Sequence, residues 1–245
     1  MFGKKNQPES VQLKRPGGAM ATRPIHFIFL ADCSGSMYGD RIQVLNDAII
    51  SVIPHMITVA NENPLAQVYV RAVKFSNGAQ WHVSQPTPVE EFRWEPLEAD
   101  GGTDMGKAFM MVADALKIPP MTARAFAPVL VLLTDGQPTD PWKAGLDALF
   151  KADWGMKSVR VAIAIGDDAD MSVLQQFTKN PELILKAETA EQLVRFIKWA
   201  STTVLKSASS PVSQAQLTGD QRFNVPIPLP PPDEDELDIS EQHSF

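Results

Sequence analysis

Two short apolar segments, each followed by an aspartate, constrain this chain more than any other feature of its sequence. Residues 25–31 (IHFIFLA) stand directly before Asp32, and residues 129–133 (VLVLL) stand before Thr134 and Asp135. Apolar runs of this length are typical of strands that are buried on both faces, as in a parallel sheet. Because the carboxyl ends of neighbouring strands flank the ligand crevice of an open α/β sheet, both aspartates are expected there.

Strand and helix patterns alternate between residues 25 and 207. Helices are expected at 41–61, 105–116, 141–152, 170–178 and 189–206, and further strands at 68–75, 80–84, 159–165 and 183–186. This alternation predicts a doubly wound α/β fold, with a mainly parallel sheet covered on both faces. The turn signal Asn77-Gly78 predicts one antiparallel edge strand.

Two of the expected helices have recognisable starts. Asp140 and Pro141 are expected to cap and open helix 141–152, and Thr189 with Gln192 predicts a capping box at the start of the final helix. The final helix also carries one apolar stripe that is expected to face the core. The residues of this stripe are Leu193, Phe196, Ile197, Ala200 and Val204.

The two ends of the chain differ from its centre in composition. Residues 1–24 are polar, and residues 208–245 contain a proline-rich stretch (225–232) followed by an acidic run. We therefore predict a folded domain at 25–207, between a flexible N-terminal segment and a disordered, proline-rich acidic tail. Six of the net −7 charges come from residues 223–245, so the folded part is nearly neutral, which disfavours a nucleic-acid surface.

The cellular location is suggested only by missing signals. Cys33 is the single cysteine, so no internal disulfide can form and nothing indicates an oxidising compartment. No apolar signal segment follows Lys4 and Lys5, and the longest apolar runs are too short to cross a bilayer. A cytoplasmic location is expected.

The first loop at the expected crevice is residues 32–36 (DCSGS). Side chains alternate along an extended segment, so Asp32, Ser34 and Ser36 are expected on one side of the loop. Cys33 is then expected to point the other way, into the core, where a small apolar side chain packs well. This loop therefore presents one carboxylate and two hydroxyls together.

Two further loops add oxygen atoms to the same edge. Residues 101–104 (GGTD) offer the hydroxyl of Thr103 ahead of a helix, and residues 134–136 (TDG) offer the carboxylate of Asp135. All of these atoms are hard oxygens, and no histidine or cysteine sulfur need join them. Such a set favours Mg²⁺ or Mn²⁺ over Zn²⁺.

These residues carry a family resemblance. In chain order and approximate spacing, Asp32-x-Ser34-x-Ser36, Thr103 and Asp135 resemble the metal-ion-dependent adhesion site (MIDAS) of von Willebrand factor A (vWA) domains, over about residues 25–206. The resemblance implies that Ser34, Ser36 and Thr103 supply hydroxyl ligands, while Asp32 and Asp135 act directly or through bound water. It also implies an open coordination position that takes an acidic group of a partner protein. All five positions match, which implies a competent site.

Within this family, residues 132–140 (LLTDGQPTD) and the compact size look like the bacterial TerY-type proteins. Those proteins are linked with tellurite resistance and with kinase and phosphatase partners. The resemblance implies a role in a bacterial stress or phospho-signalling system.

Three other interpretations of the same loops fit less well. Residues 101–107 begin like a P-loop, but Ala108 stands where Ser or Thr would bind magnesium, and no apolar strand precedes them. A phosphatase with Asp32 as nucleophile would need a second acid where Ser34 stands. A serine hydrolase would need a G-x-S-x-G elbow, which this loop lacks.

We therefore predict a non-enzymatic protein-interaction domain that depends on a divalent cation and docks a partner Asp or Glu. Two other classes remain open. One is a metal-assisted hydrolase, for which Asp104 or Asp140 would have to serve as general base. The other is a scaffold in which the metal is purely structural.

Overall fold

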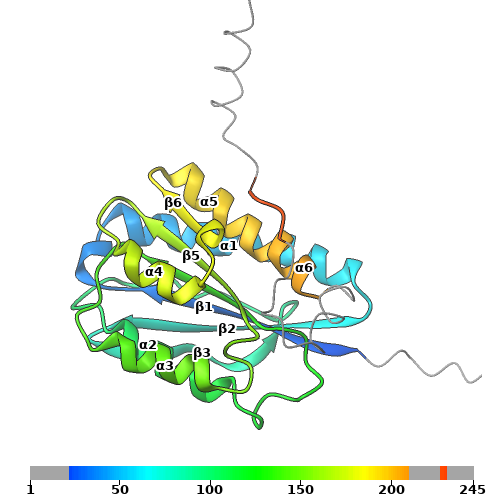
Figure 1. Ribbon diagram of the computed structural model, residues 1–245. Helices are drawn as coiled ribbons and strands as arrows, with labels where there is room; N and C mark the ends of the chain where they lie inside the picture. Colours follow the sequence, from blue (N-terminus) through cyan, green and yellow to red (C-terminus); the bar gives the residue numbers. More distant parts are fainter. Residues whose placement is uncertain (1–21, 210–226, 231–245) are drawn as a thin grey trace, which may run out of the picture.

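One six-stranded sheet organises the protein (Figure 1). The computed structural model describes residues 22–209 and 227–230, so most of the predicted end segments 1–24 and 208–245 lie outside the described residues. In the sheet order β3-β2-β1-β4-β5-β6, every neighbouring pair is parallel except β2 and β3. The strands are β1 (Arg23–Asp32), β2 (Ala66–Ser76), β3 (Gly78–Pro88), β4 (Val129–Thr134), β5 (Val159–Ile165) and β6 (Ile184–Ala187). The predicted mainly parallel sheet with one antiparallel edge strand is confirmed.

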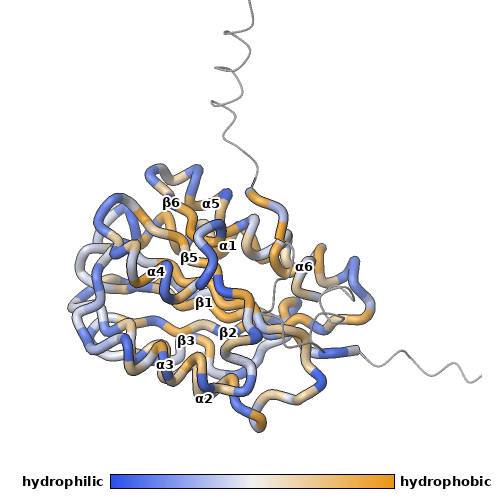
Figure 2. The backbone as a smooth tube through the Cα atoms, in the orientation of Figure 1, coloured by the Kyte–Doolittle hydropathy of each residue, from blue (hydrophilic) through white to orange (hydrophobic). Residues whose placement is uncertain are grey.

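Helices cover both faces of this sheet. One face carries α1 (Asp40–Glu62), α5 (Ala190–Trp199) and α6 (Leu205–Ala208), and the other carries α2 (Met105–Ala115), α3 (Trp142–Lys151) and α4 (Met171–Thr178). Alternate β1 side chains enter the two cores, with Phe27 and Phe29 on the α1 side and Ile28 and Leu30 on the α2 side. A strand buried on both faces is mostly apolar, and Figure 2 shows the central strands as largely apolar.

Helix α1 is the one described helix that is long and apolar enough to cross a membrane, by length and composition alone. In this structure its apolar stripe packs against the sheet. The buried members of the stripe include Ile42, Leu45, Ile49, Val52 and Met56. Here α1 is therefore a core helix of the α/β domain.

The predicted final helix is present but is not uniform. Its capping box is confirmed, since the backbone N–H of Gln192 donates to Thr189 Oγ1 over 3.2 Å and that of Thr189 donates to Gln192 Oε1 over 3.3 Å. The predicted stripe from Leu193 to Val204 is buried, but a π-helical turn, η3 (Ala200–Val204), separates α5 from α6. Val204 and Leu205, on the two sides of the junction with α6, are both fully buried.

Strand register then positions the functional loops. Ala31 of β1 pairs with Leu133 of β4, so Asp32 and Thr134 come to adjacent positions where the two strands end. The loops that carry Asp32 and Asp135 therefore follow two central, neighbouring strands, as the sequence predicts.

Candidate metal and partner-binding site

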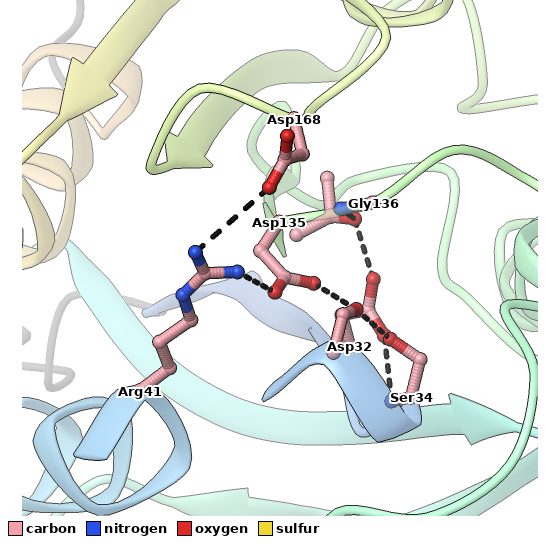
Figure 3. A network of polar contacts seen from close by, with 8 residues as sticks. Asp32, Ser34, Arg41, Asp135, Gly136 and Asp168 are labelled. Carbon is pink, nitrogen blue, oxygen red and sulfur yellow. Dashed lines mark hydrogen bonds and ion pairs between the residues drawn. The ribbon is translucent and has the colours of Figure 1, made fainter. Parts of the chain in front are cut away.

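The loop after β1 gathers three predicted site residues. The backbone N–H of Ser34 donates to Asp32 Oδ1 over 2.8 Å, and Ser34 Oγ lies 3.0 Å from Ser36 Oγ (Figure 3). The short helix η1 (Gly35–Met37) turns the chain here, so that Ser36 stays beside Ser34 and does not move away with the strand direction. The structure therefore brings one carboxylate and two hydroxyls together.

Thr103 is held in place by side chains of two neighbouring loops, which bind the backbone of its own loop. Gly101 has φ 80°, and a Cβ atom there would collide with the side chain of Asn77, so only glycine fits. The side chain of Asn77 also accepts the N–H of Gly102 over 2.8 Å, and Thr139 Oγ1 accepts the N–H of Thr103 over 2.9 Å. Two neighbouring loops thus fix the position of Thr103.

The loop after β4 ties the site together. Thr134 Oγ1 donates to Asp32 Oδ2 over 2.5 Å, and Ser36 Oγ donates to Asp135 Oδ1 over 2.7 Å (Figure 3). Asp32 and Asp135 are both fully buried as whole residues. The role of Thr134 as a direct partner of Asp32 was not expected from the sequence, although it follows from the pairing of β1 with β4.

Oxygen atoms of all three loops converge beside Gly136. A Cβ atom on Gly136 would lie 3.5 Å from Thr103 Oγ1, 3.6 Å from Ser36 Oγ and 3.9 Å from Asp32 Oδ2. One point therefore lies within contact distance of three of the five predicted ligands. A cradle lined by hydroxyl and carboxylate oxygens is chemically suited to a small, hard dication.

Carboxylates alone do not make this a metal site. Among the described residues, no group of three or more His, Cys, Asp or Glu side chains is placed to hold a metal ion. The cluster has two carboxylates, and serine and threonine hydroxyls supply its other oxygens. Its fit to a metal therefore depends on Ser34, Ser36 and Thr103 as much as on the acids.

The charge balance inside the cluster is unusual. Burial raises the pKa of Asp32 to about 6, and the nearby charge of Asp135 adds to this rise. Hydrogen bonds from Ser34 and Thr134 oppose the rise in pKa but do not cancel it. Two buried acids in close proximity favour positive charge beside them, which a bound dication would supply.

One residue that the sequence did not predict supplies positive charge here. Arg41 Nη1 lies 2.5 Å from Asp135 Oδ2, and Arg41 Nη2 lies 3.9 Å from Asp168 Oδ2 (Figure 3). The Arg41 side chain is 39% exposed, whereas that of Asp135 is fully buried. Arg41 lies in the first turn of α1, and its reach to residue 135 left no local signal in the sequence. Arg41 therefore places a positive charge of the protein itself on Asp135, a predicted metal ligand.

Because Arg41 pairs with Asp135, a predicted metal ligand, we expect Arg41→Gln to raise the affinity for Mg²⁺. An ion pair with one exposed partner contributes about 1 kcal/mol or less, so the expected gain is about fivefold. Calorimetric titration of the variant with Mg²⁺ measures it, with Arg93→Gln, whose arginine donates to nearby backbone carbonyls, as the matched control. An unchanged or weaker affinity in Arg41→Gln would show that Arg41 does not compete.

Two acids near the cluster, Asp104 and Asp140, accept hydrogen bonds from backbone N–H groups. Asp140 was predicted to cap helix 141–152, but α3 begins at Trp142, and Asp140 instead accepts the N–H groups of Gly106 and Lys107 over 2.9 and 3.0 Å. This carboxylate fills the N-terminus of α2, where a P-loop would hold phosphate. Asp104 accepts the N–H of Gly78 over 2.7 Å, and the hydrogen bond from Lys107 lowers the pKa of Asp104.

Cys33 faces the core as expected. The residue is 3% exposed, and burial raises the pKa of its thiol to about 12. Such a thiol stays protonated at neutral pH and is a poor nucleophile and metal ligand. Cys33 therefore packs and takes no part in the oxygen cluster.

The comparison with known families identifies the family to which this fold belongs. The profile of the von Willebrand factor type A domain matches residues 27–199, which is most of the chain. This chain belongs to the von Willebrand factor type A domain family. vWA domains commonly mediate protein–protein interaction or adhesion, and many bind a divalent metal at a MIDAS. No curated protein matches the sequence significantly.

Solved structures share the vWA fold at low sequence identity. Proximal thread matrix protein 1 from the mussel byssus has 18% identity and a TM-score of 0.58, over 74% of this chain and 48% of its own. The pilus adhesin SpaC from Lactobacillus rhamnosus GG has 16% identity and a TM-score of 0.60, over 76% of this chain and 30% of its own. A form of the mussel protein with a zinc-occupied MIDAS motif has 16% identity and a TM-score of 0.52, over 74% and 46%. This vWA chain spans less than half the length of each, so the likeness concerns the fold.

Proposed function

We propose that this vWA domain binds Mg²⁺ or Mn²⁺ at the oxygen cluster and uses it to dock an Asp or Glu side chain of a partner protein. The observation that carries the proposal is the convergence of Thr103 Oγ1, Ser36 Oγ and Asp32 Oδ2 beside Gly136. The zinc-occupied MIDAS of the mussel protein supports a metal site of this type in the fold. The hard oxygen set of this chain favours Mg²⁺ or Mn²⁺.

The proposed ligands differ in the charge that they bring. The hydroxyls of Ser34, Ser36 and Thr103 are neutral. The negative charge of Asp135 is partly compensated by its ion pair with Arg41. When bound, the cation would supply an electrophilic centre with uncompensated positive charge. The protein's own residues hold that centre at the carboxyl ends of β1 and β4, so that a partner carboxylate completes the charge balance.

The hydrolase alternative needs a general base near the cluster. The two acids that could serve are engaged elsewhere, since Asp140 caps α2 and Asp104 is held by Lys107 and Gly78. A carboxylate with a lowered pKa, as at Asp104, is also a weak base. These contacts favour a binding role over catalysis.

A TerY-type role is the finer part of the proposal. It rests on the resemblance of residues 132–140, and it would place the protein in the cytoplasm of a bacterium, in stress signalling with kinase and phosphatase partners. Recovery of a kinase or phosphatase on the immobilised protein with Mg²⁺, but not with EDTA, is the expected result. Recovery of neither would remove this part and leave the metal-dependent docking to be tested separately.

Docking is tested by a fluorescent acidic peptide whose anisotropy rises on binding. We expect binding with Mg²⁺ present, loss of binding in EDTA, and no binding of the same peptide with Asn and Gln in place of its acids. Gly136→Ala keeps every proposed ligand but puts a methyl group 3.5 to 3.9 Å from three of them. It should weaken binding at least tenfold by filling the cradle.

The matched control is Ala144→Ser, which adds one small group on the exposed surface of α3 and leaves the cradle as it is. This control should bind the peptide as the wild type does. Peptide binding that is equal in EDTA and in Mg²⁺ would contradict docking through the metal. Metal binding without any peptide binding would instead support the purely structural role.

A further inference from the structure

A short piece of the C-terminal region lies against the final helix. The indole N–H of Trp199, at the end of α5, donates to the backbone carbonyl of Pro228 over 2.9 Å. Ile227 is half-buried and packs against the same apolar core to which Trp199 belongs. Figure 1 shows residues 227–230 in red beside the helix formed by α5 and α6. The contact therefore has one apolar anchor and one hydrogen bond.

The chemistry of this contact suits proline-containing peptides. A proline has a backbone carbonyl but no N–H, so a peptide rich in proline offers mostly acceptors. The indole of tryptophan is a donor with an apolar body, and Trp199 is 4% exposed. Aromatic side chains that receive stiff proline-rich segments are a recurring mode of peptide recognition.

The sequence around the anchor repeats the same pattern. Residues 225–230 read as three aliphatic–proline pairs, Val225-Pro226, Ile227-Pro228 and Leu229-Pro230. Pro228, in the middle pair, is the residue whose carbonyl accepts from Trp199. Leu229 is 63% exposed, so the apolar anchor is Ile227 and not its neighbour.

We propose that the surface of α5 around Trp199 is a docking site for aliphatic–proline peptides, and that Ile227-Pro228 of the same chain is its tethered occupant. Tethering gives the occupant an effective concentration of roughly millimolar order, which holds off weaker free ligands. A partner with an aliphatic–proline segment binds here once the protein's own segment is released. The proposal is independent of metal binding, since none of the five predicted ligands takes part.

The test uses the full-length chain and a labelled peptide with the sequence of residues 223–232 (FNVPIPLPPP). Replacing the three aliphatic residues of the chain's own segment (Val225→Asp, Ile227→Asp and Leu229→Asp) releases the occupant without changing the folded domain. We expect this variant to bind the peptide at least tenfold more tightly than the wild type. A peptide with serine in place of the three aliphatic residues is the control and should bind neither protein.

Trp199→Phe, made in the released variant, keeps the aromatic packing and removes the indole donor. It should weaken peptide binding about fivefold or more. The indole N–H resonance of Trp199 gives a second readout in the unmodified site, because release of the segment breaks its hydrogen bond and should shift the resonance. Equal peptide binding by wild type and released variant, or an indole resonance that does not move on release, would overturn the proposal.

Discussion

Removal of both buried acids, in the variant Asp32→Ala/Asp135→Ala, is expected to abolish Mg²⁺ binding in the millimolar range. The two residues provide the carboxylates of the oxygen cluster, and the remaining hydroxyls carry no formal charge. Neutral oxygens alone bind a hard dication weakly because they do not compensate the cost of its dehydration. Calorimetric titration should therefore show a loss of at least 100-fold in affinity relative to the wild type.

The matched control loses the same charge at distant sites. Asp114 and Asp147 are exposed on α2 and α3, and Asp114→Ala/Asp147→Ala should bind Mg²⁺ as the wild type does. Mg²⁺ should also raise the Tm of the wild type and of the control, but not that of Asp32→Ala/Asp135→Ala. Equal Mg²⁺ affinity in the two double variants would place the metal outside the cluster.

The second large effect concerns the metal-free protein, which Asp32→Asn should stabilise at pH 7. The pKa of Asp32 is raised to about 6 in the folded protein, so the ionised carboxylate destabilises the fold. A pKa rise of this size corresponds to roughly 3 kcal/mol, and about 2 kcal/mol is expected after relaxation of the site. Asparagine can still accept the N–H of Ser34, and Thr134 can turn its hydroxyl to accept from the new amide.

The pH dependence gives this prediction its sign. Between the ordinary pKa of an aspartate, near 4, and the folded value of about 6, the folded protein binds more protons than the unfolded chain. The contribution of Asp32 to the unfolding free energy therefore falls as pH rises through this window and is level above it. Denaturant unfolding in EDTA should show this fall in wild type and in the exposed control Asp114→Asn. Parallel pH profiles of unfolding free energy for wild type and Asp32→Asn would contradict the raised pKa of Asp32.

Much of the fold and of the grouping of the cluster could be predicted because local pattern carries it. The mainly apolar runs that precede Asp32 and Thr134-Asp135 predicted doubly buried strands, and parallel strands bring their carboxyl ends to one side of the sheet. The sequence also grouped Ser34 and Ser36 with Asp32, although the helical turn Gly35–Met37, and not the expected extended alternation, brings Ser36 beside Ser34. Each of these steps depends on residues that are close in the chain.

The parts that escaped prediction depend on contacts between distant segments. Arg41 contacts Asp135, and Asp140 caps α2 instead of the helix that follows it in the chain. Neither contact produces a periodic pattern in the sequence. The packing of Ile227 and Pro228 on Trp199 likewise joins parts of the chain that no local rule connects. The π turn at Ala200–Val204 was hidden because the apolar stripe looks continuous at helical spacing.

Anomalous diffraction from crystals soaked in Mn²⁺ tests the central claim most directly, because it locates the metal without reference to activity. The account predicts one strong peak beside Gly136, in contact with the hydroxyl oxygens of Ser34, Ser36 and Thr103, and its absence in Asp32→Ala/Asp135→Ala. A peak elsewhere on the protein, or none at the cluster with Arg41 still bound to Asp135, would contradict it.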